Sequence, residues 1–204
     1  MSEQGWPEAV EILSRDPSFG PLVRKVGPIR LRPVADGHFA SLLRAVVYQQ
    51  LAGKAAAAIH ARVLEALGGR VTPDAVLAVD EGVLRASGLS RSKVRAVRDL
   101  ADQISSGAVV LDDLDDVSDD EIVERLVRVW GIGPWTARMF LLFQLRRPDV
   151  WPAGDLGVRV GWARIHGLDE PPEAKALAAA ADGYRPWRSA VAWYCWRAVE
   201  TLPG

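Results

Sequence analysis

The chain has 204 residues, of which 49% are hydrophobic and 25% charged, and its formal net charge at pH 7 is −1. This composition is typical of an ordinary soluble globular protein and excludes a disordered, collagen-like or disulfide-scaffold chain. A single cysteine, Cys195, excludes an internal disulfide and any four-cysteine metal or iron–sulfur site, so we expect it in the core. The near-zero net charge, taken alone, argues against a strongly basic nucleic-acid-binding protein.

The first residues, 1–7, are polar and lack the basic start and apolar core of a signal peptide. No apolar run approaches the roughly 18 residues that a membrane-spanning helix needs. We therefore expect a cytoplasmic protein without membrane association, which would accompany the nucleoid if the chain is bacterial. A monomer is the default expectation.

Hydrophobic periodicity predicts helices along the chain rather than strands. Apolar residues recur at helical spacing over 39–51 and again over 59–67, where Gly68 and Gly69 end the second helix. Further helices are expected to begin, in chain order, at Thr72–Pro73–Asp74, Ser90, Asp119 or Asp120, Pro134, Asp155, Pro171–Pro172–Glu173 and Pro186. The sequence thus predicts an all-α fold of about ten short helices.

One segment, residues 112–124, stands out by its charge, because it contains eight acidic residues and no basic residue. The rest of the chain contains 25 basic and 18 acidic residues, which is a positive balance. A polyanion responds to the local distribution of charge rather than to the total. The net charge of −1 therefore does not exclude DNA as a partner.

The segment 126–137 predicts two helices joined by a tight turn. An apolar helix ends at Trp130, Gly131-Ile132-Gly133 permits positive φ, and Pro134 suits a helix start. Unpaired backbone N–H groups at such a start form a ready site for an anion such as a DNA phosphate, and Thr136 adds a hydroxyl. The alternative is a plain corner between helices that needs its glycines for steric reasons alone.

These residues resemble the helix–hairpin–helix DNA glycosylase superfamily. The family's hairpin is similar to Gly131-Ile-Gly-Pro-Trp-Thr-Ala137, and its aspartate is similar to the end of Val150-Trp-Pro-Ala-Gly-Asp155, at the family's spacing. Residues 41–56 resemble the family's early helix and glutamine-containing loop. Residues 184–197 resemble the C-terminal helix of the 3-methyladenine DNA glycosylase II branch. The resemblance covers about residues 36–200 and suggests a compact form without that branch's N-terminal β domain.

The resemblance implies a single glycosylase domain, residues 1–204, with its helices in two subdomains that flank a cleft. The central six-helix part would span 36–115. The terminal part would combine 1–35 with 116–204 and would carry the hairpin and the catalytic aspartate.

The implied activity is that of a monofunctional DNA glycosylase for base excision repair. Such an enzyme flips an alkylated purine, of the 3-methyladenine or 7-methylguanine type, out of double-stranded DNA and hydrolyses its N-glycosidic bond. Asp155 would stabilise the developing sugar cation and orient the attacking water. The alternative role for Asp155 is a simple helix N-cap, and the two roles are compatible. Trp135 occupies the position of the bifunctional members' nucleophilic lysine, so no Schiff base forms there.

Seven of the eight tryptophans lie between positions 130 and 196. By the resemblance, Trp135 and Trp196 match base-pocket positions, and an indole stacks well on a cationic alkylated purine. Met139 and Tyr48 complete the predicted pocket. Core packing is the alternative for any tryptophan, and we expect it for three others, Trp130, Trp162 and Trp193.

The loop that contains Gln49 and Gln50 resembles the family segment that fills the space left by the flipped base, with Gln50 as the wedge. The alternative is the polar end of a helix. Lys54 would contact phosphate, as would the hairpin through Gly131, Gly133 and Thr136. The backbone carbonyls of three hairpin residues match a family site for a monovalent cation, Na or K: Val127, Val129 and Ile132. No other cofactor is expected.

Two other functions stay open at this point. One is a non-catalytic helix–hairpin–helix module that binds damaged DNA without cleaving it. The other is a glycosylase of another base specificity, such as uracil or an oxidised purine.

Overall fold

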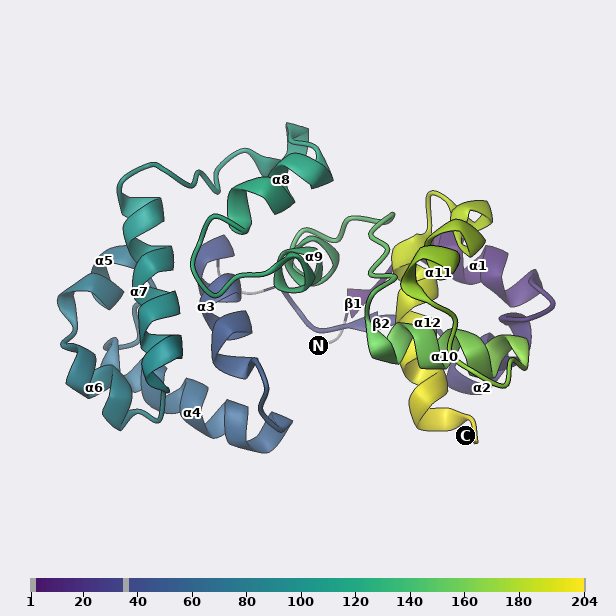
Figure 1. The fold of residues 1–204 in the computed structure, drawn as a ribbon, viewed down its shortest axis with the longest axis horizontal. Helices are drawn as coiled ribbons and strands as arrows, with labels where there is room; N and C mark the ends of the chain where they lie inside the picture. The colour runs from purple at the N-terminus through teal and green to yellow at the C-terminus, as the bar shows by residue number, and fades with distance from the viewer. Residues whose placement is uncertain (1–2, 35–36, 204) are drawn as a thin grey trace. The chain divides into compact units, whose positions relative to one another are not determined.

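The computed structural model describes residues 3–34 and 37–203. Within these ranges the protein has twelve α-helices, two 3₁₀ helices and one antiparallel sheet of two two-residue strands (Figure 1). The chain divides into a terminal unit, Met1–Pro33 with Leu141–Gly204, and a central unit, Val34–Phe140. The all-α prediction is confirmed.

The terminal unit combines both ends of the chain. Its elements are β1 (Glu3–Gln4), α1 (Pro7–Arg15), α2 (Gly20–Val26), β2 (Arg30–Leu31), α10 (Leu156–His166), α11 (Ala174–Ala180), η2 (Asp182–Tyr184) and α12 (Arg188–Thr201). Helices α10 and α12 pack so closely that a Cβ on Gly161 would lie 1.9 Å from the carbonyl oxygen of Cys195. This close approach allows the first residues of α10 to contact side chains on α12.

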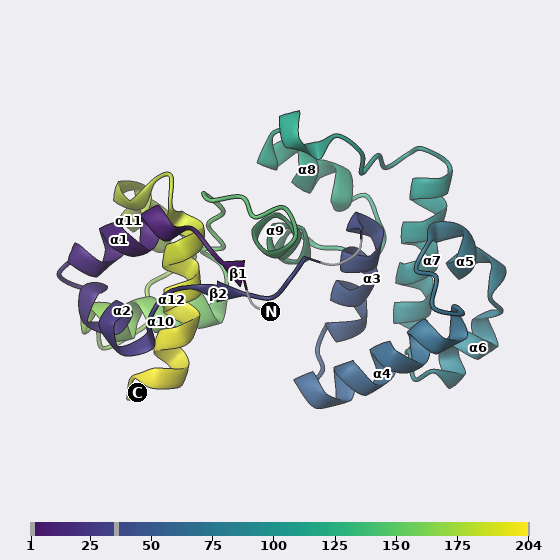
Figure 2. The same cartoon turned by 180° about the vertical axis from the view of Figure 1, so that it is seen from behind.

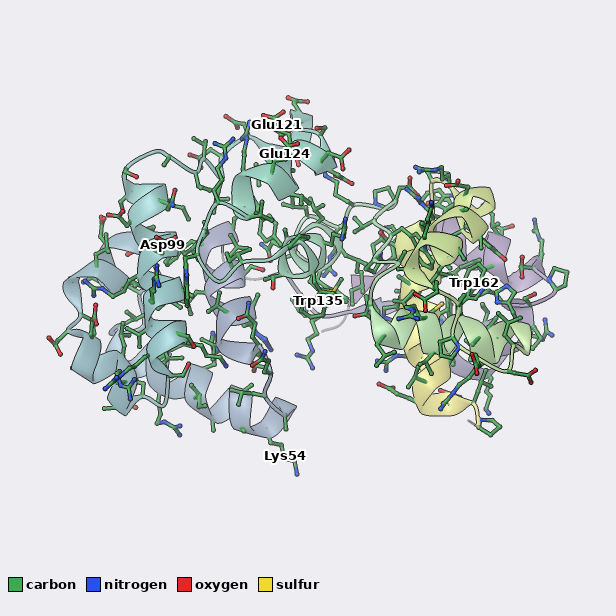
Figure 3. The ribbon with its side chains drawn as sticks, in the orientation of Figure 1. Lys54, Asp99, Glu121, Glu124, Trp135 and Trp162 are labelled. Carbon is green, nitrogen blue, oxygen red and sulfur yellow. The ribbon has the colours of Figure 1, made fainter. Side chains whose placement is uncertain are left out.

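The core of the terminal unit is rich in aromatic side chains. Trp162, labelled in Figure 3, lies on α10 and is buried. Its ring stacks on His166 at a centroid distance of 4.1 Å and meets Phe19 edge-on. Cys195 is fully buried, and burial raises the pKa of its thiol. The predictions that Trp162 and Cys195 are core residues are confirmed.

The central unit contains the elements between these two segments. They are α3 (His38–Tyr48), α4 (Gly53–Ala66), α5 (Pro73–Ala78), α6 (Glu81–Ala86), α7 (Arg91–Ser105), η1 (Leu114–Asp116), α8 (Asp119–Leu126) and α9 (Pro134–Phe143), whose last turn belongs to the terminal unit. Helix α7 packs against α3, α5 and α6, as the view from behind in Figure 2 also shows. The periodic apolar residues of α3 are buried, as the sequence predicts.

Helix starts follow local side-chain chemistry. Thr72, Ser90 and Asp155 each accept a hydrogen bond from the backbone N–H three residues ahead, as expected for N-caps. The prediction that Asp119 or Asp120 caps α8 is wrong. Ser118 is the cap, because its backbone is extended and its hydroxyl accepts the N–H of Glu121, while the aspartates occupy the first turn, where negative charge is favourable.

The boundary that the resemblance implied near residue 115 differs from the structure, in which the central unit continues to Phe140. The reason is that the glycine turn packs on this unit. Asp99 on α7 accepts the backbone N–H of Trp130 at 2.7 Å, and Gln49 after α3 donates to the carbonyl of Gly131 at 3.0 Å. The other implied boundary, between residues 35 and 36, lies outside the described residues.

The expected count of about ten helices was low, because the chain forms several short helices. Helices α5 and α6 have only six residues each, and α2 and α11 have seven. None of the helices within 3–34 and 37–203 is long and apolar enough to cross a membrane.

Candidate active site

Asp155 is the N-cap of α10 and is half-buried. Its Oδ1 accepts the backbone N–H of Val158 at 2.9 Å and the indole Nε1–H of Trp196 on α12, also at 2.9 Å. The capping role that the sequence left open is therefore real. It is compatible with catalysis, because both of these donors are neutral groups and they fix the direction of the carboxylate.

The contact between Trp196 and Asp155 requires a glycine at position 157. A Cβ on Gly157 would lie 2.9 Å from Cδ1 of Trp196 and 3.1 Å from Oδ1 of Asp155. The Trp196 ring also stacks on Phe143, with centroids 5.8 Å apart and the planes inclined at 28°. Trp196 therefore both orients the candidate catalytic carboxylate and belongs to an aromatic pair.

Phe143, whose side chain is exposed, was not predicted from the sequence as a site residue. A signal was available, because the positions 135, 139 and 143 follow the i, i+4 spacing that places residues on one helix face. Trp135 and Met139 belong to the central unit, where Trp135 is 50% exposed and Met139 is half-buried. The two predicted pocket residues on α9 thus share one face of the helix.

The glycine turn contains two glycines with different requirements. Gly131 has φ +85°, and a Cβ there would lie 2.8 Å from Cβ of Ala96, so internal packing explains it. Gly133 has no such φ, and a Cβ there would meet no atom of the described residues within 4 Å. The exposed Gly133 leaves open space at the start of α9, where an external group can approach the backbone N–H groups.

Thr136 and Gln49 form a contact inside the central unit. Thr136 is buried, and its hydroxyl accepts the side-chain N–H of Gln49 at 3.2 Å. The side chain thus faces the protein, and the expectation that this hydroxyl contacts DNA stays a prediction. Gln49 likewise turns its amide toward the turn and donates to Gly131.

Gln50 has φ +54° and is exposed, and Leu51 beside it is 38% exposed. Lys93 in the first turn of α7 reaches this loop and donates to the carbonyls of Val47 and Gln49. Lys54 is exposed in the first turn of α4, from which it projects in Figure 3. The structure therefore connects Lys93 to the predicted wedge loop, a role that the sequence did not indicate.

Tyr48 is half-buried and is engaged within the central unit. The Arg44 guanidinium lies 3.9 Å from the centroid of its ring, and the His60 ring meets it edge-on at 6.0 Å. Burial, and then the charge of Arg44, lower the pKa of His60. At least one face of the Tyr48 ring is thus covered by Arg44, which limits its use as a wall for a base.

The expectation that Trp130 packs in the core is wrong, because 37% of this residue, which directly precedes the glycine turn, is exposed to solvent. The Arg95 guanidinium lies 4.3 Å from the centroid of its ring. Asp99, one turn after Arg95 on α7, accepts the Trp130 N–H and is labelled in Figure 3. Trp193, also expected in the core, is half-buried beneath Arg197.

The carbonyls proposed for a monovalent cation belong to the turn between α8 and α9. The carbonyl of Val129 accepts the N–H of Ile132 at 3.1 Å, which leaves it a second lone pair, and Val127 is the C-cap of α8. Backbone carbonyls are suitable ligands for hard cations. Elsewhere, the described part of the chain holds no cluster of three or more His, Cys, Asp or Glu that would bind a metal ion.

Comparison with known proteins places these features in a family. Residues 43–186 match the HhH-GPD superfamily of base excision DNA repair proteins. A relative from Schizosaccharomyces pombe, named DNA-3-methyladenine glycosylase 1, is 33% identical over 92% of this chain and 85% of its own length.

Two solved structures are also similar. The S. pombe 3-methyladenine DNA glycosylase Mag1, in complex with abasic DNA, has a TM-score of 0.84 at 33% identity, covering 96% of this chain and 98% of its own. A DNA-3-methyladenine glycosidase from Bacillus halodurans has a TM-score of 0.84 at 30% identity, covering 98% and 93%. The matching hairpin, the length of the match and the shared fold lead to one conclusion: the chain belongs to the HhH-GPD superfamily of base excision DNA repair proteins.

Proposed function

We propose that this protein is a monofunctional DNA glycosylase that excises alkylated purines from double-stranded DNA in base excision repair. The observation that carries the proposal is Asp155, whose carboxylate is held by Val158 and Trp196 at the start of α10. The names of its relatives, 3-methyladenine glycosylases, support the substrate class.

The chemistry needs one well-oriented carboxylate. Alkylation at N3 or N7 makes a purine cationic, so the base leaves with the glycosidic electron pair and with little need for a general acid. Positive charge then develops on the sugar, where the Asp155 carboxylate would stabilise it. Water adds to the anomeric carbon, and Asp155 orients it or accepts its proton. The products are a free base and an abasic site.

Aromatic side chains would hold the flipped base. The indoles of Trp135 and Trp196 present electron-rich faces that attract a cationic purine more strongly than a neutral one. Trp135 also carries no amine, so water rather than an amine adds to the anomeric carbon and no Schiff base forms at that position. The reaction therefore ends at the abasic site without strand cleavage.

The hairpin would hold the DNA backbone. The backbone N–H groups at the start of α9 suit a phosphate, and the open side of Gly133 lets that phosphate approach. A monovalent cation on the carbonyls of Val127, Val129 and Ile132 would add positive charge beside it. Lys54 would contact a further phosphate, and Gln50 would enter the space left by the base. We further propose that the protein acts as a cytoplasmic monomer without another cofactor, associated with the nucleoid if bacterial.

The test is base release from a methylated duplex by the wild-type protein and by Asp155→Asn. Both the released purines and the abasic sites are counted. Asparagine keeps the acceptor oxygen but removes the charge, so we expect release to fall about a hundredfold or more. Equal release by the two proteins would refute the role of Asp155.

A panel of duplexes with uracil, oxidised and alkylated bases tests the substrate class. Release confined to alkylated purines supports the proposal. DNA binding without release from any duplex would instead identify a non-catalytic module.

A further inference from the structure

The loop between α3 and α4 holds one residue in an uncommon backbone conformation. Gln50 has φ +54°, in the left-handed region that residues with a Cβ rarely adopt. Its side chain is exposed, and so is that of Leu51. A conformation of this kind persists only where the surrounding structure holds it.

Lys93 supplies one of the contacts that hold it. The Lys93 ammonium donates to the carbonyl of Val47 at 2.7 Å and to that of Gln49 at 2.8 Å, on the segment that leads into Gln50. The backbone of Lys93 is itself fixed, because its N–H is bonded to the Ser90 hydroxyl that caps α7. Burial lowers the pKa of Lys93, as expected for an ammonium withdrawn from water.

Gln49 supplies a second contact on the same side of the loop. Its side-chain amide donates to the Gly131 carbonyl at 3.0 Å and to the Thr136 hydroxyl at 3.2 Å. The residue before Gln50 is therefore held at its carbonyl by α7 and at its side chain by the glycine turn. All of these contacts lie within the central unit.

We propose that Lys93 is a positioning residue for base extrusion, which holds Gln50 in its left-handed conformation and so presents it for insertion at the damaged base. The inference rests on the proposed function, because that function assigns Gln50 to the wedge. Gln49 joins the same loop to the turn that would bind phosphate. Backbone binding and wedge placement are then connected through one hydrogen-bonded network.

A lysine in a DNA-binding protein is more commonly a phosphate contact. Here two of the three ammonium donors are directed at carbonyl oxygens of the protein's own loop. The two roles predict different results, because loss of a phosphate contact lowers the salt dependence of DNA binding, whereas loss of a positioning contact does not.

The first experiment measures the loop itself and needs no activity. Amide hydrogen exchange at Gln49 and Leu51, whose N–H groups are bonded to Val46 and Tyr48, is compared between wild type and Lys93→Met. The matched control is Lys25→Met in the terminal unit, since Lys25 also donates to a backbone carbonyl, that of Thr201. We expect exchange at the two loop amides to become about tenfold faster in Lys93→Met only.

Unchanged exchange in Lys93→Met would overturn the proposal, whether or not the protein releases bases. Lys93→Arg is the second variant, for use if Lys93→Met does not fold. It keeps the charge but replaces the compact ammonium by a planar fork, and the same acceleration is expected.

The second experiment measures extrusion. In Lys93→Met, we expect single-turnover release of a fully paired lesion to fall about tenfold. The loss should be smaller for a lesion opposite an abasic site, because that base costs less to flip. In a Gln50→Gly background, Lys93→Met should have little further effect, since both changes act on one loop.

Equal losses on both substrates, with a salt slope reduced by about one, would make Lys93 a phosphate contact and refute the positioning role. If the wild-type protein releases no base from any duplex, the proposed function fails. The exchange measurement then decides alone whether Lys93 holds the loop.

Discussion

At the scale of single residues, the site depends on side chains that hold other side chains. Asp155 is directed by the Trp196 indole from α12, and the Gln49 carbonyl is held by the Lys93 ammonium from α7. Hydrogen-bonded partners of this kind reduce the number of orientations that a reacting group samples. Substitutions of the partners should therefore alter rates more than they alter folding.

Trp196→Phe tests the indole N–H. Phenylalanine keeps an aromatic ring beside Phe143 but removes the bond from Nε1 to Asp155. We expect the single-turnover rate of base release to fall about tenfold. The control is Trp193→Phe, three residues earlier on α12, which should leave the rate near that of wild type. Equal rates for wild type and Trp196→Phe would contradict the positioning of Asp155 by the indole.

His60 makes the stability of the protein depend on pH. Burial and Arg44 hold its folded-state pKa below the ordinary value of 6.5. The unfolded chain therefore binds the proton more readily, and stability falls as the pH drops below 6.5 toward the folded pKa. We expect His60→Gln to reduce this fall in urea titrations between pH 7 and pH 5. If the free energy of unfolding depends on pH in the same way in wild type and His60→Gln, His60 does not cause the fall in stability.

At the scale of elements, three helix starts hold residues of the proposed site. The start of α10 holds Asp155, the start of α7 holds Lys93, and the start of α9 leaves its N–H groups near open space beside Gly133. A helix start offers unpaired donors and a positive dipole end, so it suits both a carboxylate cap and a phosphate.

Gly133→Ala separates binding from folding. The Cβ would have no neighbour within 4 Å among the described residues and the φ is ordinary, so we expect stability to stay within about 1 kcal/mol of wild type. DNA affinity should fall, because the methyl group would occupy the space that a phosphate needs. Gly183→Ala, an equally open position in the terminal unit, is the control. Unchanged DNA affinity in Gly133→Ala would exclude phosphate binding at this turn.

At the scale of the whole molecule, charge is segregated along the chain. The acidic segment 112–124 forms η1 and the start of α8, and Figure 3 shows Glu121 and Glu124 on that helix. Several of its carboxylates are exposed, and Arg125 pairs with Glu121. Exposed negative charge repels DNA over a distance that salt sets.

Neutralising this segment should strengthen nonspecific DNA binding. For the pair Asp112→Asn and Asp120→Asn, two exposed positions, we expect tighter binding to an undamaged duplex at low salt. The gain should vanish near 1 M salt, where the Debye length is about 3 Å. Fluorescence anisotropy across a salt series measures it, and a gain that persists at high salt would exclude the electrostatic explanation.

Much of this protein was readable from local sequence. The glycine turn, the caps at Ser90 and Asp155, and the buried face of α3 were all predicted, because each depends on backbone angles and spacings within a few residues. The prediction that Asp119 or Asp120 caps α8 was wrong although it too concerned neighbouring residues, because Ser118, one residue before Asp119, takes the capping role. The family resemblance also rested on short segments in order.

Only the tertiary structure decided which distant side chains meet. Trp196 is 41 residues from the Asp155 that it orients, Lys93 is 44 residues from Gln49, and Gln49 is 87 residues from Thr136. Trp130 is 37% exposed, and the turn that follows it packs through Gly131 on Ala96 of α7. Such contacts depend on how whole helices pack, and periodicity within one helix carries no information about its partner. The sequence alone therefore determined the fold class and the candidate carboxylate, while packing decided how that carboxylate and the proposed wedge loop are held.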